Sequence, residues 1–265
     1  MSTVPAQPPK LDGLLRLLQI MRQLRDPAHG CPWDLAQDSR SLARYALEEA
    51  YEVVNAIESG SHVALRDELG DLLFQVVFHA QLAAEQGQFD FNQVAEGIAT
   101  KLERRHPHVF DTGTAGPRGW EAIKAEERAA RGAAGALDEV PLSLPALARA
   151  TKIGKRAATV GFDWPDARGP HAKILEELAE VEAAARGVPG STVEDEVGDL
   201  LLAVTSYARH LRVDPETALR RANARFEGRF QAMELLAQQR GLALSTLGPA
   251  ELDQLWEAVK KSVQS

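Results

Sequence analysis

The sequence predicts an all-α protein, and three observations support that prediction. Alanine and leucine together account for 75 of the 265 residues, whereas isoleucine and valine account for 24. Helices favour the first pair, and β-sheets favour β-branched side chains. Apolar residues recur at intervals of three and four, and Gly and Pro mark the stretches between them, as in helices joined by turns.

The first half is predicted to hold five helices. Apolar residues at helical spacing predict the first one, and they are Leu11, Leu14, Leu15, Leu18 and Met21. Residues 26–38 contain two prolines and a glycine and are predicted to form a loop. Further helices are expected at about residues 39–58, 61–86, 92–106 and 118–131. Gly60 and Gly87 end two of them, and Pro107 ends the next because proline disfavours helix in the preceding residue.

The second half repeats this plan after a linker. Gly132, Gly135 and Pro141 mark residues 132–144 as the linker between an N-terminal domain, 1–131, and a C-terminal domain, 145–265. Helices are expected at about 145–158, 171–186, 192–211, 215–240 and from 249 onward, with a loop at 160–170. Ser191 and Glu194 have the spacing of a capping box, and Asp214-Pro215 is a good helix start.

Composition and charge exclude several classes of protein. Hydrophobic residues make up 45% and charged residues 26%, which is ordinary for a globular protein, and the formal net charge is −8. This charge argues against a nucleic-acid coat protein, which needs clustered Lys and Arg. The single cysteine, Cys31, excludes internal disulfides and fits a cytoplasmic location. No apolar run predicts a membrane span, and the N-terminus lacks the apolar core of a secretory signal.

The most informative feature is a duplicated acidic pattern. The first set is Glu49, Glu52, Glu68 and Asp71, and the second is Glu177, Glu180, Glu196 and Asp199. Each pair has i, i+3 spacing and therefore shares one helix face. The two pairs lie 19 residues apart in both sets, and the sets lie 128 residues apart. Short-linked helices fold back antiparallel, so the four carboxylates of each set should face one another.

The surroundings of these acids favour a metal site. Apolar runs follow Asp71 and Asp199 directly, and such helices are buried. Carboxylates beside them are costly unless a cation neutralises them. An all-oxygen cluster suits Mg²⁺, with Mn²⁺ as a substitute, and Mg²⁺ takes its remaining ligands from substrate phosphates. One acidic pair alone is usually a solvated helix face, but duplication with identical spacing argues against that reading.

Three further motifs accompany the acidic sets: GCPWD at 30–34, KLERRHPHVF at 101–110 and GFDW at 161–164. With these residues the chain resembles the MazG family of nucleoside triphosphate pyrophosphohydrolases, part of the all-α NTP pyrophosphatase superfamily. The resemblance extends from about Leu14 to Lys260. It implies two tandem MazG-like helical bundle domains and a homodimer in which helices of both chains form each pocket.

The resemblance also implies roles for individual residues. In the second half, Glu177, Glu180, Glu196 and Asp199 match metal ligands and form the catalytic set, and the first acidic set is equivalent. The residues that match substrate contacts are Lys173, Lys124, Arg225, Arg229, Trp256 and Lys260, and Arg105 corresponds to Arg229 by the internal repeat. The family favours the second half as the active one, although both acidic sets are complete.

The expected activity is hydrolysis of an NTP or dNTP to the monophosphate and pyrophosphate, with broad specificity in clearing the nucleotide pool. A carboxylate, Glu176 or a free ligand oxygen, acts as the base. One alternative is a narrower enzyme for dUTP or a phosphoribosyl-nucleotide. Another is a helical interaction module that responds to nucleotide or metal without turnover, and a purely structural bundle is the last.

Overall fold

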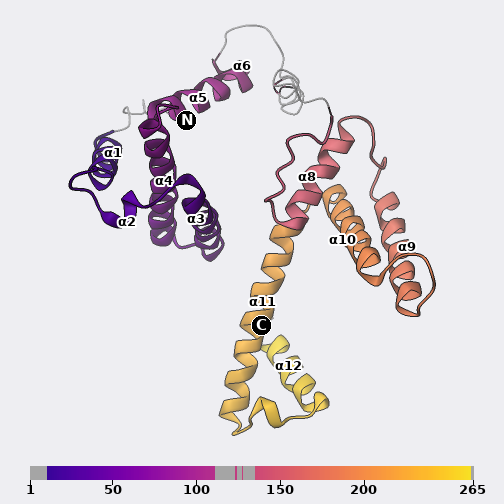
Figure 1. The fold of residues 1–265 in the computed structure, drawn as a ribbon. Coiled ribbons are helices and arrows are strands. Elements are labelled where there is room, and N and C mark those ends of the chain that lie inside the picture. The colour runs from indigo at the N-terminus through magenta and orange to yellow at the C-terminus, as the bar shows by residue number, and fades with distance from the viewer. Residues whose placement is uncertain (1–10, 111–122, 124–126, 128–134, 264–265) are drawn as a thin grey trace, which may run out of the picture. The chain divides into compact units, whose positions relative to one another are not determined.

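The computed structural model describes residues 11–110, 123, 127 and 135–263, and the chain divides into two compact units, 1–124 and 125–265. Every regular element in these described residues is a helix, which confirms the all-α prediction (Figure 1). None of the described helices is both long and apolar enough to cross a lipid bilayer.

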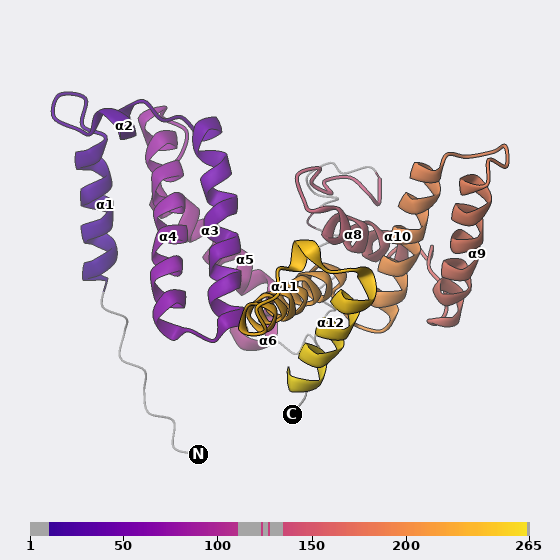
Figure 2. The same ribbon diagram turned by 90° about the horizontal axis from the view of Figure 1, so that it is seen from below.

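The first unit is built around a helical hairpin. Its elements are α1 (Asp12–Leu24), α2 (Pro32–Leu35), α3 (Ser39–Ser59), α4 (His62–Glu85), α5 (Phe91–Arg105) and α6 (Pro107–Phe110). Helices α3 and α4 lie side by side, and α1 packs against α4 (Figure 2). The core between these helices consists of Met21, Leu42, Val77, Phe78 and Leu82.

Local signals fix the ends of this hairpin. Asp38 caps α3 because its side chain accepts hydrogen bonds from the backbone N–H groups of Arg40 and Ser41, and the Ser41 hydroxyl accepts the backbone N–H of Asp38. Gly60 ends α3 with φ at 71°, a left-handed conformation that favours glycine. Ser61 then caps α4, so the chain reverses within two residues and sets the two helices face to face.

The second unit contains the corresponding hairpin and a longer C-terminal pair. Its elements are α8 (Ala146–Ala158), α9 (Arg168–Ala185), α10 (Val193–His210), α11 (Pro215–Gln239), a 3₁₀ turn (Leu244–Thr246) and α12 (Pro249–Val263). Helices α9 and α10 form the hairpin, α8 packs against α10 and α11, and α12 packs against α11. Met233, Ala237, Leu255 and Val259 form the core between α11 and α12.

Three local predictions are wrong in detail. The predicted loop at 26–38 contains the short helix α2, because Pro32 suits a first helical position. Helix α9 begins at Arg168, three residues earlier than expected, since Pro170 lies in the first turn where its missing N–H costs nothing. Thr192 rather than Ser191 caps α10, with Asp195 completing the capping box.

Some predictions fall outside the described residues. The predicted helix at 118–131 is described only at residues 123 and 127, both of which are helical. Lys124 and the linker residues 132–134 also lie outside the described part of the chain.

The core of the first unit provides a stability prediction. Phe78 is fully buried, so Phe78→Ala should lower the free energy of unfolding of this unit by about 3–5 kcal/mol. Phe89 is 44% exposed, and Phe89→Ala should change it by no more than about 0.5 kcal/mol. Denaturant unfolding followed by circular dichroism measures both values. Equal destabilisation by the two variants would contradict this account of the core.

Candidate functional site

The α3–α4 hairpin brings acids of the first set together. Carboxylate oxygens of Glu49 on α3 and of Glu68 and Asp71 on α4 lie within 4.8 Å of one another. Glu52, one turn beyond Glu49, forms a hydrogen bond with Glu68. Burial is the first cause that raises the pKa of both Glu49 and Glu68 above the ordinary carboxyl value, and neighbouring acids add to it.

The α9–α10 hairpin carries the equivalent cluster, and the carboxylates of this cluster are more buried than those of the first. Carboxylate oxygens of Glu177, Glu196 and Asp199 lie within 4.8 Å of one another. Glu177 is only 3% exposed and Glu196 8% exposed, whereas Glu49 and Glu68 are half-buried. Glu180 lies at the edge of the cluster, exposed, and forms a hydrogen bond with Glu177. The second unit therefore removes more of its carboxylate charge from water than the first.

The second cluster favours a bound cation electrostatically. Burial, followed by the charges of Glu177 and Asp199, raises the pKa of Glu196. The hydrogen bond to Glu177 is the main cause that raises the pKa of Glu180. Each shift shows that a further negative charge is disfavoured at these positions. A divalent cation among the oxygens would reverse that effect, so the residues fit a metal with oxygen ligands.

Lys173 adds a positive charge to the second cluster. Its Nζ lies 2.6 Å from Oε1 of Glu177 and 2.7 Å from Oε1 of Glu176, one turn along α9. The bond to Glu176, with that to Glu177, raises the pKa of Lys173 well above its ordinary value. One ammonium group cannot balance the carboxylates around it. The cluster keeps a negative excess that attracts a cation.

The first cluster has no lysine at the equivalent position. The residue that lies 128 positions before Lys173 is Tyr45, whose ring lies 6.2 Å from that of Trp33 in the GCPWD motif. The sequence alone contains this difference, because residues 128 positions apart are equivalent in the repeat. Comparing only the acidic residues of the two halves did not reveal it. The two clusters thus share their carboxylates and differ in the cation beside them.

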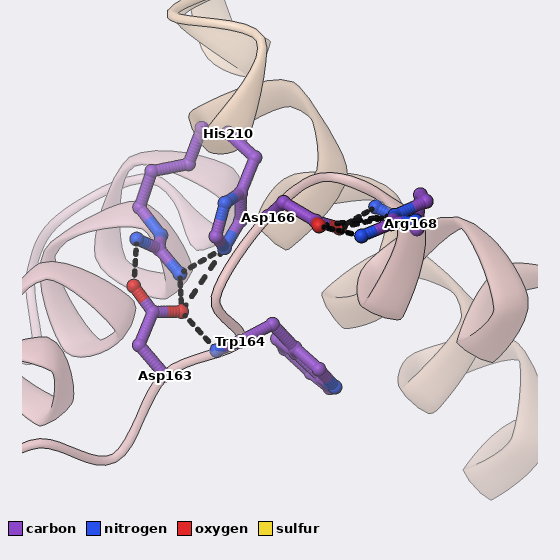
Figure 3. Close-up of polar contacts among 6 residues, drawn as sticks. Asp163, Trp164, Asp166, Arg168 and His210 are labelled. Atoms are coloured by element: carbon purple, nitrogen blue, oxygen red, sulfur yellow. Dashed lines mark hydrogen bonds and ion pairs between the residues drawn. The ribbon is translucent and has the colours of Figure 1, made fainter.

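A cavity of about 350 Å³ adjoins the second cluster. Lys173, Glu177 and Asp199 line it, together with residues of α8, α10 and the GFDW motif. Asp163 of this motif accepts hydrogen bonds from Nη1 of Arg209 at 2.8 Å and from Nη2 at 2.5 Å, and Nε2 of His210 lies 3.0 Å away (Figure 3). The bond from Arg209 is the largest cause that lowers the pKa of Asp163 to about 2.

Close packing also holds the loop that carries this motif. A Cβ at Gly154 would lie 3.1 Å from Nε of Arg209, and a Cβ at Gly169 would lie 2.1 Å from Cδ1 of Trp164. The Arg209 side chain therefore lies against the backbone of α8, and the Trp164 ring covers the first turn of α9. The sequence analysis named GFDW as a motif but did not find its partners Arg209 and His210. Nothing in the sequence distinguishes these two residues from the other polar residues of their helix.

The remaining predicted substrate contacts lie elsewhere in the fold. Arg225 and Arg229 are on α11, and Trp256 and Lys260 are on α12. Trp256 packs against Phe226 with ring centroids 5.2 Å apart, and Nζ of Lys260 lies 2.6 Å from Oε1 of Glu257. None of these four residues lines the cavity beside the second cluster. Arg105 ends α5 in the first unit.

Comparisons with known proteins agree with the sequence resemblance. The MazG nucleotide pyrophosphohydrolase domain family matches residues 37–110. The chain is 49% identical to a nucleoside triphosphate pyrophosphohydrolase of Escherichia coli K12, over 93% of this chain and 96% of the relative. It is 43% identical to the nucleoside triphosphate pyrophosphohydrolase/pyrophosphatase MazG of Thermotoga maritima, over 92% and 94%. A relative of Mycobacterium tuberculosis is 36% identical, over 72% of this chain and 56% of its own.

Removing Lys173 should destabilise the metal-free protein. Lys173→Met leaves the buried Glu177 without its partner and should lower the free energy of unfolding by about 1–2 kcal/mol in chelator. Lys260→Met breaks an i, i+3 pair that is more exposed on its acidic side, and it should cost at most about 0.5 kcal/mol. Denaturant unfolding in chelator tests both, and the account of the pair is wrong if the two variants behave alike.

The lowered pKa of Asp163 predicts a pH dependence. An acid whose pKa falls on folding stabilises the fold above its ordinary value of 3.8, and this contribution disappears as the pH falls towards 2. The difference in unfolding free energy between the wild type and Asp163→Asn should therefore be largest above pH 4 and shrink between pH 4 and pH 2. Urea unfolding at several pH values measures it. A difference that stays constant over this range would refute the assignment.

Proposed function

This chain belongs to the MazG family of nucleotide pyrophosphohydrolases, and we propose that it hydrolyses nucleoside triphosphates at the acidic cluster of its second unit. The products are a nucleoside monophosphate and pyrophosphate. The observation that carries the proposal is the group of Glu177, Glu196 and Asp199, whose oxygens lie within 4.8 Å of one another on two helices beside a cavity. The 49% identity with the E. coli nucleoside triphosphate pyrophosphohydrolase over nearly the whole chain supports it.

The proposed cofactor is Mg²⁺, with Mn²⁺ as a substitute. Carboxylates alone form the cluster, and hard divalent cations prefer oxygen ligands. Glu177, Glu196 and Asp199 would hold the ion, with Glu180 at the edge as the fourth ligand. When bound, Mg²⁺ supplies positive charge to the phosphates and makes a bound water more acidic.

Two side chains of the chain itself have proposed roles in the reaction, one in binding phosphate and one as the base. Water attacks the α-phosphorus, the bond from this phosphorus to the bridging oxygen breaks, and pyrophosphate leaves with the electron pair. Lys173 has three N–H donors, of which Glu176 and Glu177 use two, so the third can bind a phosphate oxygen. Glu176 is exposed and lies outside the cluster; its Oε1 accepts from Lys173, and its other carboxylate oxygen would accept the proton of the attacking water as the base.

Broad substrate specificity and a difference between the two units also belong to the proposal. Lys173 lies beside the second acidic set, and the equivalent position of the first set holds Tyr45. The carboxylates of the second set are also more deeply buried. Both differences favour the second unit as the site of turnover. The first unit would then bind metal or nucleotide more weakly.

A homodimer would complete the pocket. Arg225, Arg229, Trp256 and Lys260 belong to the α11–α12 pair and do not line the cavity of their own chain, so we propose that a second copy brings them to the phosphates. Single chains also leave apolar side chains exposed, such as Leu73 and Val76 on α4 and Leu201 on α10. Exposed apolar residues that share one helix face, as Leu73 and Val76 do, favour an interface with a second copy.

The proposed activity predicts specific products and a specific loss. With Mg²⁺, the protein should convert ATP to AMP and pyrophosphate, and it should act on other NTPs and dNTPs. Glu177→Gln or Asp199→Asn should lower kcat/KM at least about a hundredfold, because ligand loss costs more than loss of a supporting residue. Glu49→Gln should have a smaller effect. Chromatographic product analysis on eight NTPs and dNTPs, with and without chelator, measures all of this.

Two results would overturn the scheme. Nucleoside diphosphate and phosphate as products would mean that the protein cleaves between the β- and γ-phosphates instead of between the α- and β-phosphates. A larger loss from Glu49→Gln than from Glu177→Gln would assign turnover to the first unit instead.

A further inference from the structure

One buried carboxylate of the second cluster has a hydrogen-bond donor in the loop between α9 and α10. The hydroxyl of Ser191 donates to Oε1 of Glu196. Among the residues that the structure describes, this hydroxyl is the only donor to the Glu196 side chain, which is 8% exposed. A buried carboxylate without a donor is costly, so the bond stabilises the position in which Glu196 lies near Glu177 and Asp199.

The loop itself fixes the backbone of Ser191. Residues 186–192 form this loop, and both of its ends are bonded to the neighbouring helices. The backbone N–H of Val188 donates back to a carbonyl of α9, and Thr192 forms the capping box of α10. Gly190 has a φ of 156°, a conformation that favours glycine. Ser191 lies between Gly190 and Thr192, so its position is set before any ligand binds.

The contact of Ser191 differs from the one that the sequence predicted. The spacing of Ser191 and Glu194 predicted a cap for α10, but Thr192 caps that helix. The start of α10 therefore does not need the Ser191 hydroxyl. This hydroxyl bonds instead to Glu196, just beyond the first three residues of the helix.

The first cluster lacks this arrangement. The residue 128 positions before Ser191 is Val63, which has no hydroxyl and lies within α4 rather than in a loop. The acid equivalent to Glu196 is Glu68, which forms a hydrogen bond with another acid, Glu52. The bond from a serine is thus a feature of the second unit, where we propose that turnover takes place.

From these contacts we infer that Ser191 is a positioning residue for the metal site of the second unit. Its hydroxyl holds Oε1 of Glu196 and leaves the other oxygen of this carboxylate to a divalent cation. Hydrogen bonds of this kind orient metal-binding carboxylates, and their loss typically lowers metal affinity about 10–100-fold. The inference rests on the proposed function, because that proposal makes Glu196 a ligand of Mg²⁺ or Mn²⁺.

Equilibrium dialysis of the full-length protein against Mn²⁺, without nucleotide, tests the inference. Glu68→Gln disables the first cluster, so the remaining Mn²⁺ binding reports the second. In that background Ser191→Ala should raise the Kd for Mn²⁺ about tenfold, and Ser191→Thr, which keeps the hydroxyl, should restore it. In a Glu196→Gln background the remaining binding reports the first cluster, and Ser191→Ala should leave that Kd unchanged.

The metal requirement of the activity separates positioning from a general loss of structure. Ser191→Ala should raise the Mn²⁺ concentration for half-maximal ATP hydrolysis about tenfold, while kcat at saturating Mn²⁺ stays close to that of the wild type. Thr192→Ala, which removes the cap of α10, is the matched control. It should lower the midpoint of urea unfolding and change the metal requirement by less than about twofold.

Three results would overturn the inference. The first is that Ser191→Ala binds Mn²⁺ at the second cluster as tightly as the parent protein or more tightly, since the hydroxyl would then be idle or compete with the ion. The second is that Thr192→Ala weakens Mn²⁺ binding as much as Ser191→Ala does. The third is that the Glu68→Gln protein binds no Mn²⁺ without nucleotide.

Failure of the proposed function is a separate result. If the wild type hydrolyses no triphosphate, the proposed function is wrong, but a weaker Kd for Mn²⁺ in Ser191→Ala that Ser191→Thr restores would still support the inference. If the wild type hydrolyses triphosphates and Ser191→Ala leaves the Kd unchanged, the inference alone is wrong.

Discussion

Both candidate sites depend on holding like-charged carboxylates together between two helices. Mutual repulsion and partial burial oppose this arrangement, as the raised pKa values of Glu49, Glu68 and Glu196 show. Packing of the α3–α4 and α9–α10 hairpins must offset that cost, which is why apolar residues follow each acidic pair directly. A cation bound at such a site would add its binding free energy to the stability of the fold.

The repeat places the same acidic scaffold in two different surroundings. The acids and their spacing are common to both units, so each hairpin keeps the geometry that gathers the carboxylates. The surroundings differ, since Tyr45 packs against Trp33 in the first unit and Lys173 bonds to Glu176 and Glu177 in the second. The burial of the carboxylates differs as well, since Glu177 is almost fully buried and Glu49 is half-buried. Under the proposed function, the difference between the two units therefore comes from the residues that border the acids, because the acids are the same in both.

Much of the fold was predictable because its signals are local. The helical spacing of apolar residues and the helix end at Gly60 are contained in short stretches of sequence, and the structure agrees with both. The grouping of acids followed from their i, i+3 spacing and the short connection between helices. The start of α9 was missed because Pro170 suggests a loop, yet proline is tolerated in a first turn.

Contacts between distant residues could not be predicted in the same way. The bonds of Asp163 to Arg209 and His210 span more than forty positions, and nothing in either stretch marks the partner. The location of Arg225, Arg229, Trp256 and Lys260 apart from the cavity is likewise a matter of tertiary arrangement. The resemblance supplied their roles, which stay predictions until substrate contacts are measured.

The contact between Trp164 and Gly169 links two parts of the second unit mechanically. The indole ring lies on the first turn of α9, and the same helix carries Lys173 and Glu177 further along. Even an alanine at position 169 would push the indole off the first turn of α9, so the wall that Trp164 gives to the cavity depends on a glycine five residues further along the chain.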